Sequence, residues 1–100
     1  MKLTENQRKH LRRLGHALKP VVMIGNAGLT DAVAAEIDAA LEHHELIKIR
    51  VRVGDRTKRD DVMDGVVERL SAELVQRIGN MALLYRPAEE PKLALPESGG

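Results

Sequence analysis

The sequence has no cysteine, phenylalanine or tryptophan, and Tyr85 is its only aromatic residue. Without cysteine there can be no disulfide bond, thiolate metal site or cysteine nucleophile. The lack of aromatic side chains argues against RNA-recognition motifs, cold-shock domains and OB-folds, because these folds stack bases on aromatic platforms. Any nucleic-acid binding should therefore depend mainly on backbone contacts and on shape.

Long hydrophobic runs are absent too. No stretch approaches the roughly 20 apolar residues that span a membrane, and the N-terminus lacks the apolar run of a signal peptide. The 100 residues are 43% hydrophobic, which suits one domain with a modest core. We expect a cytoplasmic protein whose residues 1–87 form a single domain and whose residues 88–100 form a flexible tail.

Residues that could support catalysis or metal binding are not grouped in a useful way. Ser71 and Ser98 are the only serines, and neither is paired with a base and an orienting acid. His43 and His44 are adjacent, so on a helix they point about 100° apart, and no two histidines are four residues apart. We expect no catalytic residue, metal, cofactor or small-molecule substrate.

The net charge of +1 hides a sorting of charge along the chain. Residues 1–30 and residues 46–59 each contain six basic residues and one acidic residue. Residues 31–45 contain five acidic residues and no basic one, and residues 60–73 contain five acidic residues and one basic one. If the basic segments meet on one face, that face can attract phosphate. Ordinary solvated faces would show the same blocks, so charge alone leaves both interpretations open.

Hydrophobic periodicity predicts three helices and four strands. The helices are expected over residues 4–16, 31–44 and 58–73, and the strands over residues 21–24, 46–53, 75–78 and 81–86. Strand–helix–strand units need parallel neighbours, and the Gly79-Asn80 connection predicts an antiparallel hairpin. The predicted fold class is therefore α/β (α+β), with the order α-β-α-β-α-β-β and a four-stranded mixed sheet.

Capping residues mark the predicted helix starts. Thr4 and Gln7 form a capping-box pattern, Thr30 is a typical N-cap, and Thr57 with Asp60 would cap the third helix. In the first helix the residues at helical spacing expected to face the core are Leu11, Leu14 and Leu18.

The first two predicted strands differ in pattern. Residues 21–24 form an apolar run, which predicts a strand buried on both faces. Residues 46–53 alternate apolar side chains with Lys48, Arg50 and Arg52, so one face of this strand should be basic and at least partly open to solvent.

The loop from Gly25 to Gly28 joins a strand to a helix start. Glycine allows close approach of another chain, and free N–H groups at a helix start favour anions. Such a GxxG loop clamps the nucleic-acid backbone in KH domains. Two glycines are also common in ordinary turns, and Asp31 would oppose an anion unless it points away.

The motifs resemble those of a known family. Its central signature resembles residues 18–30, LKPVVMIGNAGLT, and its second signature resembles residues 42–48, EHHELIK. The helix QRKHL at 7–11 and YRP at 85–87 also fit. The sequence is therefore similar to the CRM-domain family, and in particular to its single-domain bacterial members of the YhbY type; the match is looser beyond Val53.

The resemblance implies RNA binding, and an association with precursors of the large ribosomal subunit that assists ribosome assembly. It implies a fold like the C-terminal domain of translation initiation factor three. The residues it implicates in RNA binding are Arg8, Lys9, Arg12, Arg13, Lys19, Gly25, Asn26, Ala27 and Gly28. Our hypothesis is that they form one continuous surface on a monomer, which binds ribosomal RNA.

Two other functions stay open at this point. A protein-interaction module could dock on a ribosomal protein or assembly factor through the acidic helices, around Asp38, Glu42, Asp64 and Glu68. An RNA-modifying enzyme would need a reactive group that the sequence does not offer. The sequence also leaves open whether Lys48, Arg50 and Arg52 contact RNA.

Overall fold

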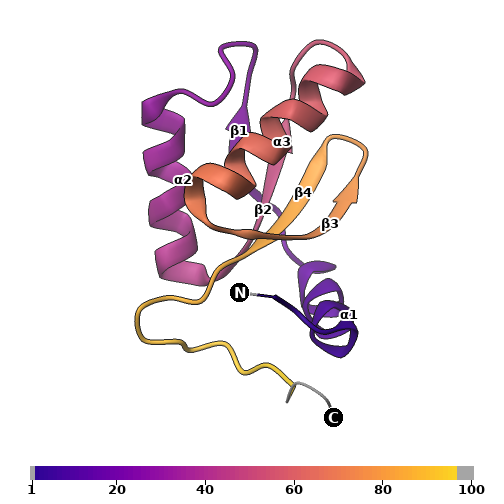
Figure 1. Cartoon of the computed structure of the whole chain (residues 1–100), viewed down its shortest axis with the longest axis vertical. Coiled ribbons are helices and arrows are strands. Elements are labelled where there is room, and N and C mark those ends of the chain that lie inside the picture. Colours follow the sequence, from indigo (N-terminus) through magenta and orange to yellow (C-terminus); the bar gives the residue numbers. More distant parts are fainter. Residues whose placement is uncertain (1, 97–100) are drawn as a thin grey trace.

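The computed structural model describes residues 2–96, and this part of the chain folds in the predicted order (Figure 1). The elements are α1 (Glu5–Gly15), β1 (Pro20–Ile24), α2 (Asp31–His44), β2 (Leu46–Val51), α3 (Arg56–Leu70), β3 (Glu73–Ile78) and β4 (Met81–Tyr85). Residues 97–100, including Ser98, lie outside the described residues. None of the helices from residue 2 to residue 96 is long and apolar enough to cross a membrane.

The four strands form a mixed sheet in the order β1-β2-β4-β3, which confirms the predicted fold class. β1 is parallel to β2, and β4 is antiparallel to both of its neighbours. The predicted hairpin turns at Gly79, whose φ of 57° suits glycine. The carbonyl of Asn80 then accepts a hydrogen bond of 2.7 Å from Val51 N–H, which ties the turn to the end of β2.

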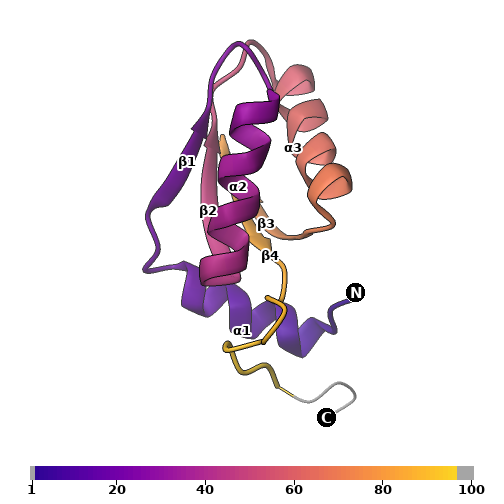
Figure 2. The same cartoon turned by 90° about the vertical axis from the view of Figure 1, so that its left-hand side faces the viewer.

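The two faces of the sheet are covered unequally. α2 and α3 lie side by side over one face (Figure 1), where they bury the larger core around Ile37, Ile49 and Val66. α1 lies crosswise at one end of the molecule (Figure 2) and packs on side chains of the opposite face. These are Leu46, Val75, Leu83 and Tyr85. The rest of the opposite face has no helix over it, so we call it the open face.

Close packing of α1 depends on a glycine. A Cβ atom added at Gly15 would lie 2.5 Å from Cδ2 of Leu83. A larger residue would therefore push α1 away from β4. Gln7, Leu11 and Gly15 form the buried stripe of α1, whereas Leu14 is 38% exposed, so the prediction that Leu14 faces the core is wrong.

The helix caps are partly as predicted. The Thr4–Gln7 capping box and the Thr30 cap are confirmed. The cap of α3 is Asp55, whose carboxylate accepts a 2.9 Å hydrogen bond from Lys58 N–H, so the assignment of Thr57 is wrong. α3 also ends at Leu70, because Ser71 adopts a left-handed φ of 52° that ends the helix.

β1 is an edge strand, which corrects the prediction that it is buried on both faces. Val22 and Ile24 are buried beneath α2, but Val21 is 51% exposed and Met23 is 54% exposed on the open face. An apolar run shows that a strand is suited to burial, not that another element covers it. The pairing of β1 with β2 ends at Ile24 and Val51, so β2 stops two residues earlier than predicted.

Candidate functional site

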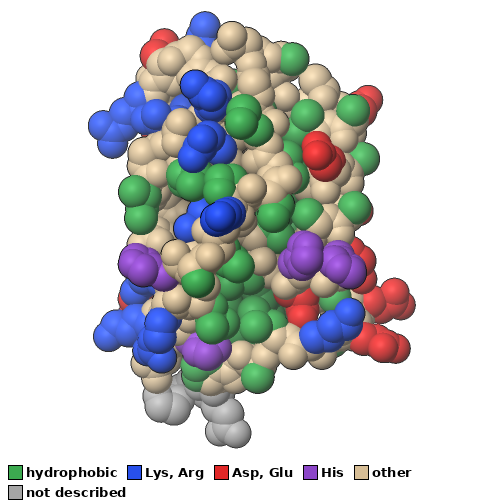
Figure 3. Space-filling view, turned by 180° about the vertical axis from the view of Figure 1, so that it is seen from behind, with side chains coloured by type: hydrophobic (Ala, Val, Ile, Leu, Met, Phe, Trp, Pro, Cys, Tyr) green, Lys and Arg blue, Asp and Glu red, His purple; other side chains and the backbone are tan. Residues whose placement is uncertain are grey.

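The open face is basic with exposed apolar side chains between the charges. Lys48 and Arg50 point to it from β2 because they alternate with Ile47, Ile49 and Val51, which are buried on the helix side. Figure 3 views this face, with Lys and Arg side chains (blue) among hydrophobic ones (green) and most Asp and Glu side chains (red) toward one edge. The alternation predicted for this strand is thus confirmed.

Three cations of the open face have no internal partners in the described part of the chain. Within residues 2–96, Lys19, Lys48 and Arg50 make no hydrogen bond or ion pair through their side chains. The Nε atom of Arg50 is buried and lacks an acceptor in the same part of the chain, as does Nε of Arg59 in α3, so this atom does not distinguish the open face. Arg50 is only half-buried, and its unpartnered guanidinium can donate to an acceptor supplied from outside.

Shallow hollows connect α1 to these cations. Arg12, Arg13 and His16 line one hollow with Gln76, and Gln76 lines the next with Lys48. Lys48 and Lys19 both line a groove. Lys19 also lines the last hollow, together with Arg50. Because each hollow shares a residue with the next, a continuous path crosses the open face. Its residues are Arg12, Arg13, His16, Gln76, Lys48, Lys19 and Arg50.

The GxxG loop lies at the other end of β1 from α1 (Figure 1). The five residues of β1 separate them by about 17 Å. Gly28 N–H donates to the carbonyl of Gly25 at 2.9 Å, and Gly28 has a φ of 75°. Asn26 and Ala27 are exposed, and a Cβ atom at Gly25 or Gly28 would meet nothing within 4 Å. The helix and the loop can therefore share one surface only through the open face between them.

The cations of α1 are not equivalent. Arg8 donates to the carbonyl of Leu74 at 2.9 Å and lies 3.8 Å from Glu73, so it links α1 to β3. Arg12 pairs with Glu5 at 3.2 Å. Lys9 and Arg13 are exposed, and within residues 2–96 their side chains have no partner. Lys9 and Arg13 are thus the cations of α1 that are most available to a ligand.

Asp31 does not leave an unbalanced charge at the start of α2. Its carboxylate lies 2.7 Å from Nη2 of Arg69, at the end of α3. The hydroxyl of Thr30 caps the helix by accepting a hydrogen bond from Val33 N–H. The objection that Asp31 would repel an anion at the loop is therefore weakened by its ion pair with Arg69.

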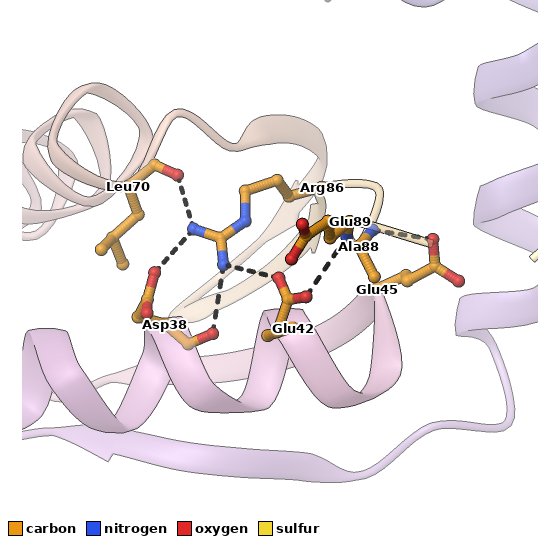
Figure 4. Close-up of polar contacts among 7 residues, drawn as sticks. All are labelled: Asp38, Glu42, Glu45, Leu70, Arg86, Ala88 and Glu89. Atoms are coloured by element: carbon orange, nitrogen blue, oxygen red, sulfur yellow. Dashed lines mark hydrogen bonds and ion pairs between the residues drawn. The ribbon is translucent and has the colours of Figure 1, made fainter. Parts of the chain in front are cut away.

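Two of the four acidic residues of the alternative protein-docking surface, Asp38 and Glu42, form contacts within the domain (Figure 4). Arg86 Nη1 donates to Asp38 at 2.8 Å and to the carbonyl of Leu70 at 3.0 Å, and Arg86 Nη2 lies 3.9 Å from Glu42. Asp38 and Glu42 thus hold the end of β4 against α2 and α3. The two remaining acidic residues of that surface, Asp64 and Glu68, are exposed.

Sequence reasoning missed a buried carboxylate at the end of α2. Glu45 is 2% exposed and has a φ of 65°, where helices usually end with glycine. It accepts hydrogen bonds from the N–H groups of Ala88, Lys92 and Leu93 at 3.0, 2.7 and 2.8 Å; Figure 4 draws the first. Burial raises the pKa of Glu45, but these bonds and the charge of Lys92 outweigh it and hold the pKa below its ordinary value.

The C-terminal segment is attached by these bonds to the rest of the domain. Leu93 and Leu95 pack beside the smaller core under α1, and Gln7 donates to the carbonyl of Pro96 at 3.0 Å. The domain boundary at residue 87 and the flexible tail stay predictions, now with specific contacts to test. Across residues 2–96, no three His, Asp or Glu side chains are close enough to hold a metal ion.

Comparisons with known proteins agree over nearly the whole chain. The family model of the CRS1 / YhbY (CRM) domain matches residues 3–86. A Haemophilus influenzae protein named "RNA-binding protein" is 47% identical over 94 residues, which are 94% of this chain and 95% of that protein. A Pseudomonas aeruginosa protein named "Probable RNA-binding protein" is 42% identical, over 91% of this chain and 88% of its own. A solution structure from Staphylococcus aureus, described with a suggested RNA-binding role, superimposes with a TM-score of 0.81 at 35% identity, covering 95% of this chain and 100% of its own.

Proposed function

The chain belongs to the CRS1 / YhbY (CRM) domain family, and from this premise we propose that it binds RNA across the open face. The binding surface runs from Lys9 and Arg13 of α1, over the face of β2, to the GxxG loop. The observation that supports it most directly is the set of unpartnered cations Lys19, Lys48 and Arg50, within the described residues, on a face that no helix covers.

The surface suits an RNA backbone. Lysine and arginine side chains contact phosphates, and these contacts position the nucleic acid without reading its sequence. At the far end of the surface, Gly25 has open space where a side chain would stand, so a sugar–phosphate chain can approach the loop closely. Tyr85 is 2% exposed and cannot stack a base, so recognition involves no aromatic stacking and depends mainly on RNA shape and backbone.

The proposed RNA is ribosomal RNA in precursors of the large subunit. The family resemblance supports this target, and a role in ribosome assembly follows from it. The protein then acts in the cytoplasm as a monomer and without catalysis. Lys48, Arg50 and Arg52, which the sequence left unassigned, belong to the RNA surface in this proposal.

A salt series tests the proposal. Binding of the full chain to a fragment of large-subunit ribosomal RNA should give a log–log slope of about −0.7 for each phosphate neutralised on single strands. Lys48→Gln and Arg50→Gln should each reduce the magnitude of the slope by about 0.7, because each removes one cation. Arg77→Gln is the matched control, since it removes one charge from the helix side at β3, the sheet edge opposite β1, where Arg77 pairs with Asp60.

Two outcomes would contradict the proposal. Absence of salt-dependent binding to any fragment would remove RNA as the ligand of the open face. An equal loss of slope in Arg77→Gln would show that net charge, not this surface, drives binding. Association with a ribosomal protein that survives nuclease and high salt would instead point to the acidic helices.

A further inference from the structure

The open face contains an apolar groove that phosphate binding does not explain. It has a volume of about 490 Å³ and lies where α1, β1, β2 and the C-terminal segment meet. Its apolar lining includes Leu14, Leu18, Val21 and Leu93, and Lys19 and Lys48 stand at its sides. A groove of this size is within the range of small-ligand sites, and it lies directly on the path of the proposed RNA.

Two apolar side chains of the groove are exposed without a partner. Leu14 is 38% exposed and Val21 is 51% exposed. Exposure of large apolar groups is unfavourable, so an occupant that covers them gains from the hydrophobic effect. Because phosphates and riboses are polar, an RNA backbone alone would not give that gain.

The charges around the groove identify the chemistry of the occupant. Its lining contains the cations Lys19 and Lys48 together with His44, and no Asp or Glu. An occupant that matches this lining has an apolar body and a negative group beside it. A nucleotide has both, as a base attached to a phosphate. Acidic protein side chains would match the cations, but they would add no flat apolar body for the groove.

We propose that this groove receives one unstacked base of the bound RNA, an inference that rests on the proposed function. The base lies against the aliphatic side chains of Leu14 and Val21, and Lys19 and Lys48 contact its phosphate. Aliphatic packing here takes the place of the aromatic stacking that this sequence lacks outside its buried Tyr85. The groove gives the protein one position where an RNA base, and not only its backbone, contributes to affinity.

The C-terminal segment completes the groove. Leu93 forms one wall, and its N–H donates to the buried carboxylate of Glu45 at 2.8 Å. Glu45 is therefore a positioning residue: it fixes Leu93 without touching the base. This assigns a use to a glutamate that stands where a helix usually ends with glycine.

An abasic scan tests the inference. Single abasic ribonucleotides are placed along the ribosomal RNA fragment, which keeps every phosphate, and the affinity is measured at each position. For the unaltered chain, removing the base at one position should lower the RNA affinity about tenfold, as expected for one base contact. The double variant Leu14→Gln/Val21→Thr should bind the intact fragment about tenfold more weakly, lose this position dependence and keep the salt slope.

The control is Val62→Thr, which changes a half-buried apolar residue of α3 on the helix side of the sheet, away from the groove and from the hollows that lead to it. It should keep both the affinity and the position dependence. A flat abasic scan with an unchanged salt slope would overturn the base site and leave the proposed function standing. Loss of all RNA binding by the unaltered chain would overturn both. Unchanged RNA affinity of the double variant, with loss of a bound protein, would reassign the groove to a protein partner.

Discussion

The two sides of the sheet use their charges in opposite ways. On the helix side, three arginines are paired within the chain: Arg69 with Asp31 at 2.7 Å, Arg77 with Asp60 at 3.2 Å, and Arg86 with Asp38 at 2.8 Å. Within residues 2–96, Arg56 and Arg59 of α3 are the exceptions, since their side chains make no ion pair. On the open face, Lys19, Lys48 and Arg50 have no such partners anywhere in residues 2–96. A net charge of +1 conceals this difference.

The difference separates residues that hold the fold from residues available to a ligand. An internal ion pair neutralises both of its charges, and it stabilises the fold most when it is partly buried and also bonds the backbone. An unpaired surface cation adds little to stability, so its removal should affect binding and not folding. Three variants, two of them with a contrasting variant, test how far this division holds, and the three are ordered by their expected effect on the free energy of unfolding.

Arg86→Met should have the largest effect. The side chain of Arg86 is 18% exposed and bonds Asp38 and the carbonyl of Leu70. Its loss leaves the partly buried carbonyl of Leu70 and the carboxylate of Asp38 without their charged donor, so the free energy of unfolding should fall by about 3 kcal/mol. Urea unfolding followed by circular dichroism measures this, and RNA affinity should change little once the variant is folded.

Lys48→Met is the matched control on the open face. It removes one cation and keeps an unbranched side chain, so stability should change by less than about 0.5 kcal/mol while RNA binding weakens. Equal destabilisation by Arg86→Met and Lys48→Met would contradict the proposed division between fold-stabilising and ligand-binding charges.

Glu45→Gln should have an intermediate effect that depends on pH. Because the folded pKa of Glu45 lies below its ordinary value of 4.5, its stabilisation is present above pH 4.5 and is lost as the pH falls through the folded pKa. At neutral pH the free energy of unfolding of the variant should be lower than that of the unaltered protein by about 2 kcal/mol, and this gap should close in acid. Urea unfolding from pH 7 to pH 3 measures the gap, and hydrogen exchange at Leu93 N–H reports attachment of the segment. A gap that stays constant across this range would contradict the assigned role of the carboxylate.

Gly25→Val should have the smallest effect on stability and a clear effect on binding. Gly25 has no positive φ, and a Cβ atom there would meet nothing within 4 Å, so the fold should lose less than about 0.5 kcal/mol. RNA affinity should fall about tenfold, because the added side chain blocks close approach of the backbone. Gly28→Ala is the contrasting variant: its φ of 75° predicts a loss of about 1 kcal/mol in stability. Unchanged RNA affinity in Gly25→Val would remove the loop from the binding surface.

Local patterns were enough to predict most of the fold. Thr4 with Gln7, Thr30, and the alternation around Lys48 each depend on neighbours in sequence, and each is confirmed. The error at Thr57 arose because Asp55, two residues earlier, is also a strong cap. The run from Val21 to Ile24 shows a different limit, because burial of an edge strand depends on which elements lie over it.

The candidate site was harder to predict because its parts meet only in three dimensions. The roles of the helix and loop residues stay predictions. The chain order already placed a strand between them, but it did not show that Lys48 and Arg50 of the neighbouring strand lie on the face between helix and loop. Arg8 looked equivalent to Arg13 in sequence, and its bond to Leu74, 66 residues away, distinguishes it. Glu45 was missed for the same reason, since its three donors lie 43 to 48 residues further on.

The single aromatic ring also gives this protein an optical signal of its own. Tyr85 sits beneath α1 beside Leu11 and Leu83, and it is 2% exposed. Burial, with the charge of Glu45 adding to it, raises the pKa of Tyr85. All tyrosine absorbance and emission therefore come from one point under the helix that bears Lys9 and Arg13. When α1 leaves the sheet, that phenol meets water and ionises more readily, so an alkaline spectrophotometric titration reports the docking of α1 without any label.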